Sequence, residues 1–262
     1  MTEKTTIDDL RQKPHWSYSA LNCYLQCPLK YYYRYVANAP VERTGVCIPF
    51  GKAFHSTLSA RAVHGMNFSL EEGRESFAEC FRLETEAAQE LRYKEGETFD
   101  TCLAKGFDML KAAWDSWQDE FAVKGVAVPF SVTVPGLKRP LVGEFDLVVD
   151  DGGADTIVDW KTSASKWGMD RVERDMQPSA YCYAYKQEHG ISPVFRFDIY
   201  TKAKTPTVTS LYTVRKEDAL ARFAFTVAGI EKGVEQGCFY PNVCCMNCSE
   251  CPYRNRCEKE GR

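Results

Sequence analysis

Hydrophobic positions along the chain follow two different periods, one typical of strands and one of helices. Between residues 143 and 162, two apolar runs, G-E-F-D-L-V-V-D and I-V-D-W-K-T, flank the turn-forming tetrapeptide 151–154. Two β-branched runs joined by such a turn predict an antiparallel hairpin. Alternating segments at 126–134, 195–200 and 207–212 predict further strands around it.

Helical spacing of apolar residues marks the remaining segments. They are residues 17–36, interrupted at Pro28, and residues 51–63, 70–94, 98–121, 170–189 and 216–236. Ser17 or Ser19 can cap the first helix, and the last is expected to be capped near Thr213. The two amphipathic helices at 70–94 and 98–121 are predicted to form part of the core or a lid, and they carry no candidate catalytic residues.

Composition narrows the class of protein. A length of 262 residues suits one large domain, or a domain with a helical insertion. The net charge of −3 gives no global basic field, although a groove on an acidic protein can still be basic. No apolar run approaches the roughly 20 residues of a membrane span, and residues 1–13 are polar. We therefore expect an intracellular protein that does not enter a membrane.

The predicted hairpin also carries the first candidate chemistry. Side chains two positions apart on a strand share a face, so Asp159 and Lys161 project together while Trp160 points the other way. Asp146 on the neighbouring strand can face the same side. Such a group can hold a divalent cation and place an amine beside metal-bound water. An isolated D-x-K, however, is more often a surface ion pair, and a lone helical histidine such as His55 is more often structural.

Twelve cysteines are many for a chain of this length. Five of them lie close together near the C-terminus: Cys244, Cys245, Cys248, Cys251 and Cys257. Their spacing predicts a metal site rather than disulfides in a reducing compartment. One alternative is a self-contained zinc knuckle that uses Cys245 as the fourth ligand. The other takes its fourth thiolate from Cys27, or from Cys23, and joins the two ends of the chain as an iron–sulfur centre can.

Four short motifs occur in order along the chain: G-K-A-F-H at 51–55, G-E-F-D at 143–146, D-W-K-T at 159–162 and Q-P-S-A-Y at 177–181. Together with the bracketing cysteines they resemble the PD-(D/E)XK nuclease superfamily in its RecB-like branch. This branch includes the AddB nuclease domain and the CRISPR-associated RecB-type exonucleases. The resemblance extends from Ser17 to Cys257. It implies an α/β, restriction-endonuclease-like core with a mixed central sheet flanked by helices.

The resemblance also implies residue roles. His55, Asp146, Asp159 and the backbone carbonyl of Trp160 would ligate Mg²⁺ or Mn²⁺. Lys161 would position or deprotonate the attacking water, with Gln177 and Tyr181 orienting the lysine or a phosphate behind it. The cysteines that would hold a [4Fe–4S] cluster are Cys27, Cys248, Cys251 and Cys257. Cys23, Cys244 and Cys245 are alternates, and Zn²⁺ is the alternative metal.

The implied function is a metal-dependent DNA exonuclease acting on ends or single strands in recombination, repair or CRISPR-type processing. The implied setting is the cytoplasm of a bacterial or phage-infected cell, with a recombination or CRISPR-type protein partner. Residues 1–15 would be a flexible lead-in and residues 16–262 one nuclease domain, with a helical insertion at about 66–125 and a cysteine-rich segment at 238–262. Two other functions stay open, namely an inactive nucleic-acid-binding adaptor on this fold and a zinc-ribbon interaction protein.

Overall fold

A computed structural model describes residues 5–117, 122–243 and 248–261. The chain forms two compact units, each assembled from separate stretches of sequence. The first unit comprises residues 1–44, 129–144 and 216–262. The second comprises residues 45–128 and 145–215 and contains every residue of the predicted metal site.

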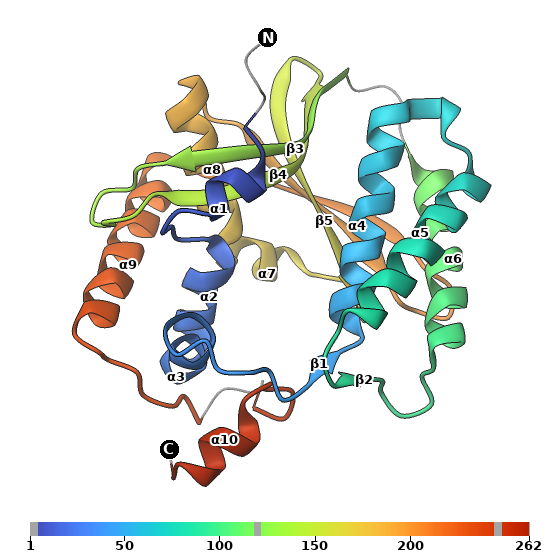
Figure 1. The fold of residues 1–262 in the computed structure, drawn as a ribbon. Helices are drawn as coiled ribbons and strands as arrows, with labels where there is room; N and C mark the ends of the chain where they lie inside the picture. Colours follow the sequence, from blue (N-terminus) through green and yellow to red (C-terminus); the bar gives the residue numbers. More distant parts are fainter. Residues whose placement is uncertain (1–4, 118–121, 244–247, 262) are drawn as a thin grey trace. The chain divides into compact units, whose positions relative to one another are not determined.

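A five-stranded mixed sheet runs in the order β3-β4-β5-β6-β7 (Figure 1). The strands are β3 (Ala122–Val132), β4 (Leu141–Asp151), β5 (Ala154–Ser163), β6 (Val194–Thr201) and β7 (Val208–Val214). β5 pairs parallel with β6, whereas β4 with β5 and β6 with β7 pair antiparallel. The expected mixed α/β fold with flanking helices is therefore confirmed.

The predicted hairpin between β4 and β5 is confirmed. Asp151 pairs with Ala154, and the register continues to Leu147 opposite Val158. Gly152 and Gly153 form the two-residue turn with φ angles of +64° and +89°. Both angles lie in the left-handed region that glycine adopts without steric cost, and they give the turn a twist that matches the strands.

The parallel pairing of β5 with β6 requires a crossover, and two helices supply it. They are α7 (Met169–Arg174) and α8 (Gln177–His189). The ring of Tyr181, which lies on α8, packs against Phe145 of β4 and Phe195 of β6. This crossover brings the start of α8 against the face of β5 that carries Asp159.

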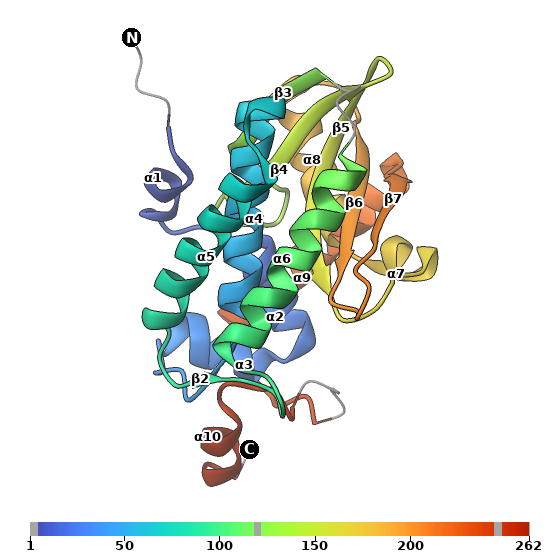
Figure 2. The same ribbon diagram turned by 90° about the vertical axis from the view of Figure 1, so that its right-hand side faces the viewer.

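The opposite face of the sheet packs against three helices of the second unit, which lie side by side in Figures 1 and 2. These are α4 (Cys47–His64), α5 (Leu70–Glu86) and α6 (Phe99–Ser116). The 3₁₀ turn η2 (Gly65–Asn67) follows α4, and β1 (Thr44–Gly45) and β2 (Leu91–Arg92) form a separate two-stranded sheet. Their shared core includes Phe54, Phe77, Val158 and Trp160. The helix expected over 70–94 ends at Glu86 instead, because the chain turns there toward β2.

The first unit holds the remaining helices. They are α1 (Ile7–Arg11), α2 (Tyr18–Gln26), α3 (Pro28–Tyr31), the π-helical turn η1 (Tyr32–Val36), α9 (Glu217–Glu235) and α10 (Arg254–Lys259). Ser17 caps α2 by accepting a hydrogen bond from the Ala20 N–H. α9 is capped at Lys216 rather than near Thr213, because β7 continues to Val214.

Trp16 anchors the core of this unit. Its indole N–H donates to Glu231 of α9 over 2.6 Å, and its ring stacks on Tyr31 and lies under the Arg139 guanidinium. Among the described residues, no helix is both long and apolar enough to cross a bilayer.

Candidate active site

Asp159 lies on β5 at the centre of the predicted site. Its side chain is only 3% exposed, and Oδ1 accepts a hydrogen bond from the Gln177 side-chain amide at the start of α8. The Lys161 ammonium, 27% exposed, forms a close ion pair with Oδ2. The alternation of the strand therefore places Asp159 and Lys161 together, as the sequence predicts.

Asp146 and His55 form the second half of the site. The Nδ1 of His55, on α4, lies 3.2 Å from the Asp146 Oδ2. The same carboxylate oxygen accepts the backbone N–H of Trp160 over 3.0 Å. Asp146 is therefore tied to β5 at Trp160, the residue between Asp159 and Lys161.

Asp159, Asp146 and His55 have shifted pKa values. Burial raises the pKa of Asp159 to about 6, with the Asp146 charge adding to the rise and Lys161 opposing it. Burial acts against the charged forms of Asp146 and His55 too. Their mutual hydrogen bond and the surrounding opposite charges together outweigh burial, so the pKa of Asp146 is lowered and that of His55 is raised.

The second oxygen of Asp159 is engaged by a positive charge. Within the described part of the chain Oδ2 has no hydrogen bond of standard geometry, and its contact is the close ion pair with the Lys161 ammonium. A cation of the protein itself therefore offsets part of the cost of burying this oxygen. Across residues 5–117, 122–243 and 248–261, however, no three His, Cys, Asp or Glu side chains are grouped closely enough to hold an ion.

Gln177 and Tyr181 occupy successive turns of α8. Gln177 contacts Asp159 directly, whereas the Tyr181 ring packs on Phe145 and Phe195. The turn before α8 is held by Asp175, whose carboxylate accepts the Gln177 backbone N–H over 2.8 Å.

Sequence reasoning did not identify Arg215, which fixes this turn. Its buried guanidinium donates to the backbone carbonyls of Val172 over 2.7 Å and Asp175 over 3.2 Å, and it pairs with Glu173 at 2.9 Å. Arg215 follows β7 immediately, in no recognisable motif. Only the tertiary fold brings it beneath the helix that carries Gln177.

The described cysteines of the proposed cluster gather in the first unit. Cys27, Cys248, Cys251 and Cys257 line one cavity of about 300 Å³. Burial raises the pKa of Cys251 and of Cys257, and the other cysteines of the cavity add to the rise.

The alternates are distributed differently. Cys23 is buried within α2, where burial raises its pKa to about 11, and it is not among the residues that line the cavity. Cys244 and Cys245 lie outside the described residues.

Both ends of the chain contribute to the cavity. The Arg43 Nε donates to the Cys251 carbonyl over 3.2 Å, and the Tyr33 hydroxyl donates to Glu260 over 2.8 Å. The Glu42 carboxylate accepts the backbone N–H groups of Asn255 and Arg256 at the start of α10. The C-terminal segment is therefore held against the N-terminal helices by contacts that do not involve sulfur.

Comparison with known proteins places this geometry in a family. The crystal structure of a "Putative exonuclease" from Eubacterium rectale aligns with 90% of this chain and 84% of its own, at 14% identity and a TM-score of 0.58. A second structure, SSO0001, aligns with 92% and 95% of the two chains at 12% identity, and its TM-score of 0.41 is too low to establish a shared fold. No curated protein matches significantly. The profile of the PD-(D/E)XK nuclease superfamily matches residues 15–258, and the chain belongs to that superfamily.

Proposed function

We propose that this protein is a metal-dependent DNA exonuclease that hydrolyses phosphodiester bonds at DNA ends or in single strands. One observation carries the proposal most directly. The buried Asp159 is paired with Lys161 and lies beside the linked pair His55 and Asp146. This arrangement gathers two carboxylates, an imidazole and an ammonium, the groups that a metal-dependent hydrolase uses.

The donor set fits Mg²⁺ or Mn²⁺, which prefer carboxylate and carbonyl oxygens and accept an imidazole. In this proposal Asp146, Asp159, His55 and the Trp160 carbonyl hold the ion. Members of the superfamily generally use such divalent metals. When bound, the ion supplies a Lewis acid that offsets charge on the phosphate and lowers the pKa of water.

Side chains and backbone groups of the protein supply the remaining positioning and charge stabilisation in this proposal. Lys161 holds a proton and a positive charge at the position where the phosphate becomes more negative. Gln177 donates to Oδ1 of Asp159 and would hold this carboxylate in place for the ion. The Trp160 N–H orients the Asp146 carboxylate. We assign Tyr181 a supporting role, in which its ring seats α8 on the sheet.

We also propose a [4Fe–4S] cluster held by Cys27, Cys248, Cys251 and Cys257. Its support is the shared cavity that these four cysteines line and the thiolate chemistry that such clusters require. Zn²⁺ held by the same residues is the alternative. In either case the metal would add a covalent link between chain ends that already contact each other.

The experiment that tests the nuclease assignment uses end-labelled single- and double-stranded DNA with Mn²⁺ and a chelator control. We expect the wild type to release nucleotides from ends. Lys161→Met should lower the rate at least about 100-fold, the loss typical of one charge-stabilising group. Lys111→Met removes a surface lysine that pairs with Asp115 and should retain full activity. Full activity in Lys161→Met would refute the assignment.

A non-catalytic nucleic-acid-binding protein on this fold is the second candidate. One observation favours it, namely that the described residues bring no three metal-ligating side chains into a group. The same digestion separates the two functions. DNA binding without any cleavage across Mg²⁺ and Mn²⁺ would favour the adaptor.

A further inference from the structure

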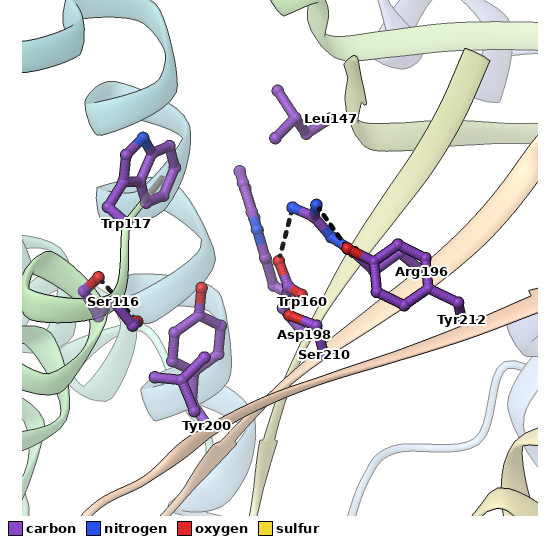
Figure 3. Close-up of a pocket in the computed structure, with 11 residues that line it drawn as sticks. Ser116, Trp117, Leu147, Trp160, Arg196, Asp198, Tyr200, Ser210 and Tyr212 are labelled. Atoms are coloured by element: carbon purple, nitrogen blue, oxygen red, sulfur yellow. Dashed lines mark hydrogen bonds and ion pairs between the residues drawn. The ribbon is translucent and has the colours of Figure 1, made fainter. Parts of the chain in front are cut away.

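A cavity of about 260 Å³ opens on the face of the sheet opposite Asp159 and Lys161. The register explains its position, because Trp160 pairs with Asp198, and Asp198 with Ser210, so their side chains share that face. The C-terminal end of α6 completes the wall with Ser116 and Trp117 (Figure 3). This volume is near the lower end of ligand pockets and suits one small molecule.

The hydroxyl of Tyr200 is directed into this cavity (Figure 3). Tyr200 is 4% exposed, and burial places the pKa of its phenol well above the ordinary value. Among the described residues no hydrogen bond ties this hydroxyl to a side chain or to the backbone, and the ring packs edge-on against Phe54. The hydroxyl is therefore available to a group inside the cavity.

The polar wall of the cavity carries one guanidinium beside two carboxylates. The Arg196 guanidinium donates to Asp198 over 3.1 Å, and the Ser210 hydroxyl donates to the other oxygen of Asp198 over 2.6 Å. Asp151 lies 3.8 Å from Arg196. Two carboxylates therefore face one guanidinium, which disfavours a phosphate and favours an uncharged ligand with N–H donors.

The remaining walls are aromatic. Trp117, Trp160 and Tyr212 line the cavity around the polar group (Figure 3). Aromatic faces combined with a hydrogen-bonding edge are what proteins use to hold a nucleobase taken out of a helix. We propose that this cavity binds an uncharged nucleobase, as the free base or the nucleoside, with Tyr200 bonding its edge.

This cavity is separate from the metal site but shares one residue with it. The Trp160 indole lines the cavity, while its backbone N–H donates to Asp146 on the catalytic side. A ligand in the cavity would therefore bind without contacting Asp159 or Lys161. Binding can be tested independently of cleavage, and failure of one proposal leaves the other intact.

The test is isothermal titration of the full-length protein with adenosine, guanosine, cytidine and uridine, and with their 5′-monophosphates. We expect saturable binding of at least one nucleoside, with weaker binding of its monophosphate. Tyr200→Phe removes only the hydroxyl and should weaken binding roughly three- to tenfold, the effect of one hydrogen bond. Val208→Trp fills the cavity from β7 and should abolish binding.

Two control variants test whether binding occurs in this cavity. Tyr93→Phe removes a hydroxyl from a tyrosine of the same unit that does not line the cavity, and Asp159→Asn alters the opposite face of the sheet. Both variants should bind nucleosides with the affinity of the wild type. The absence of saturable binding by all four nucleosides would overturn the proposal. Unchanged affinity in Tyr200→Phe, or tighter binding of the monophosphates, would also overturn it.

Discussion

Asp159 combines burial with a requirement for charge. Its pKa of about 6 means that part of the population carries a proton near neutral pH, and a protonated carboxyl cannot ligate a cation. The raised pKa of His55 acts in the same direction, because a protonated imidazole cannot ligate either. In the proposed metal site, both groups would therefore have to lose protons before an ion binds.

Mn²⁺ affinity should therefore rise as pH increases from about 5 to about 8, with proton release on binding, because the Asp159 pKa of about 6 lies within this range and the His55 pKa is raised above its ordinary value. Calorimetry in two buffers of different ionisation enthalpy measures the released protons. Asp159→Asn should weaken binding and flatten its pH dependence. An affinity that is constant over this range would contradict the role given to Asp159.

At the scale of single residues, the sequence correctly predicts the side-chain positions that follow from strand alternation. Asp159, Lys161 and Trp160 lie as their spacing requires, and Asp146 reaches them across the hairpin. The hydrogen bond from Gln177 to Asp159 joins residues far apart in sequence, and only the family motif indicated it. Arg215 belongs to no motif, so no sequence signal identified it.

Among the elements, α7 and α8 set the geometry of the catalytic face. Their connection depends on Arg215, whose bonds to Val172 and Asp175 fix the turn that starts α8. Helix boundaries were less predictable than strand pairing. The end of α5 at Glu86 and the cap of α9 at Lys216 depend on neighbouring strands rather than on local spacing.

Arg215→Met should lower kcat between about 10- and 100-fold with little change in KM, because Gln177 would lose its alignment. If Arg215 is a positioning residue acting through Gln177, the same change in a Gln177→Ala background should cost much less. Steady-state kinetics on the four proteins of this cycle, with melting temperatures, supply the test. Fully additive losses would show that Arg215 acts by another route.

The contact between α5 and α6 allows no extra volume. A methyl group on Gly106 would overlap the Phe77 ring, so Gly106→Ala should destabilise the fold by about 1–3 kcal/mol. Gly229 on α9 is an exposed control with open space around it among the described residues. Gly229→Ala should stabilise by about 0.5–1 kcal/mol. Urea unfolding measures both, and equal effects would contradict the packing argument.

Across the whole molecule, the two units are assembled from interleaved segments, so neither corresponds to a continuous stretch of sequence. Sequence periodicity predicts the elements but not this division, which arises from contacts between distant segments. The cysteine spacing predicts a metal link between the chain ends, which stays a prediction. The hydrogen bonds of Arg43, Glu42 and Tyr33 between the same ends belong to no motif, so the sequence did not indicate them.

The proposed cluster should give anaerobically purified protein a brown colour and about four irons per chain. Cys257→Ser should lose the iron and lower the melting temperature, because the link between the chain ends is lost. Cys47→Ser, at an exposed cysteine of the other unit, should lose neither. Stoichiometric zinc without iron would replace the cluster by a zinc site.

Trp160 has one further consequence. Its main chain steadies a carboxylate on one surface of the sheet, while its ring forms part of a chamber on the reverse surface. A synthetic compound that fills this cavity would contact β5 on the face opposite the proposed metal site and could shift Asp146 through the Trp160 main chain. Such an inhibitor would leave the proposed substrate site open, and raising the substrate concentration would not relieve it.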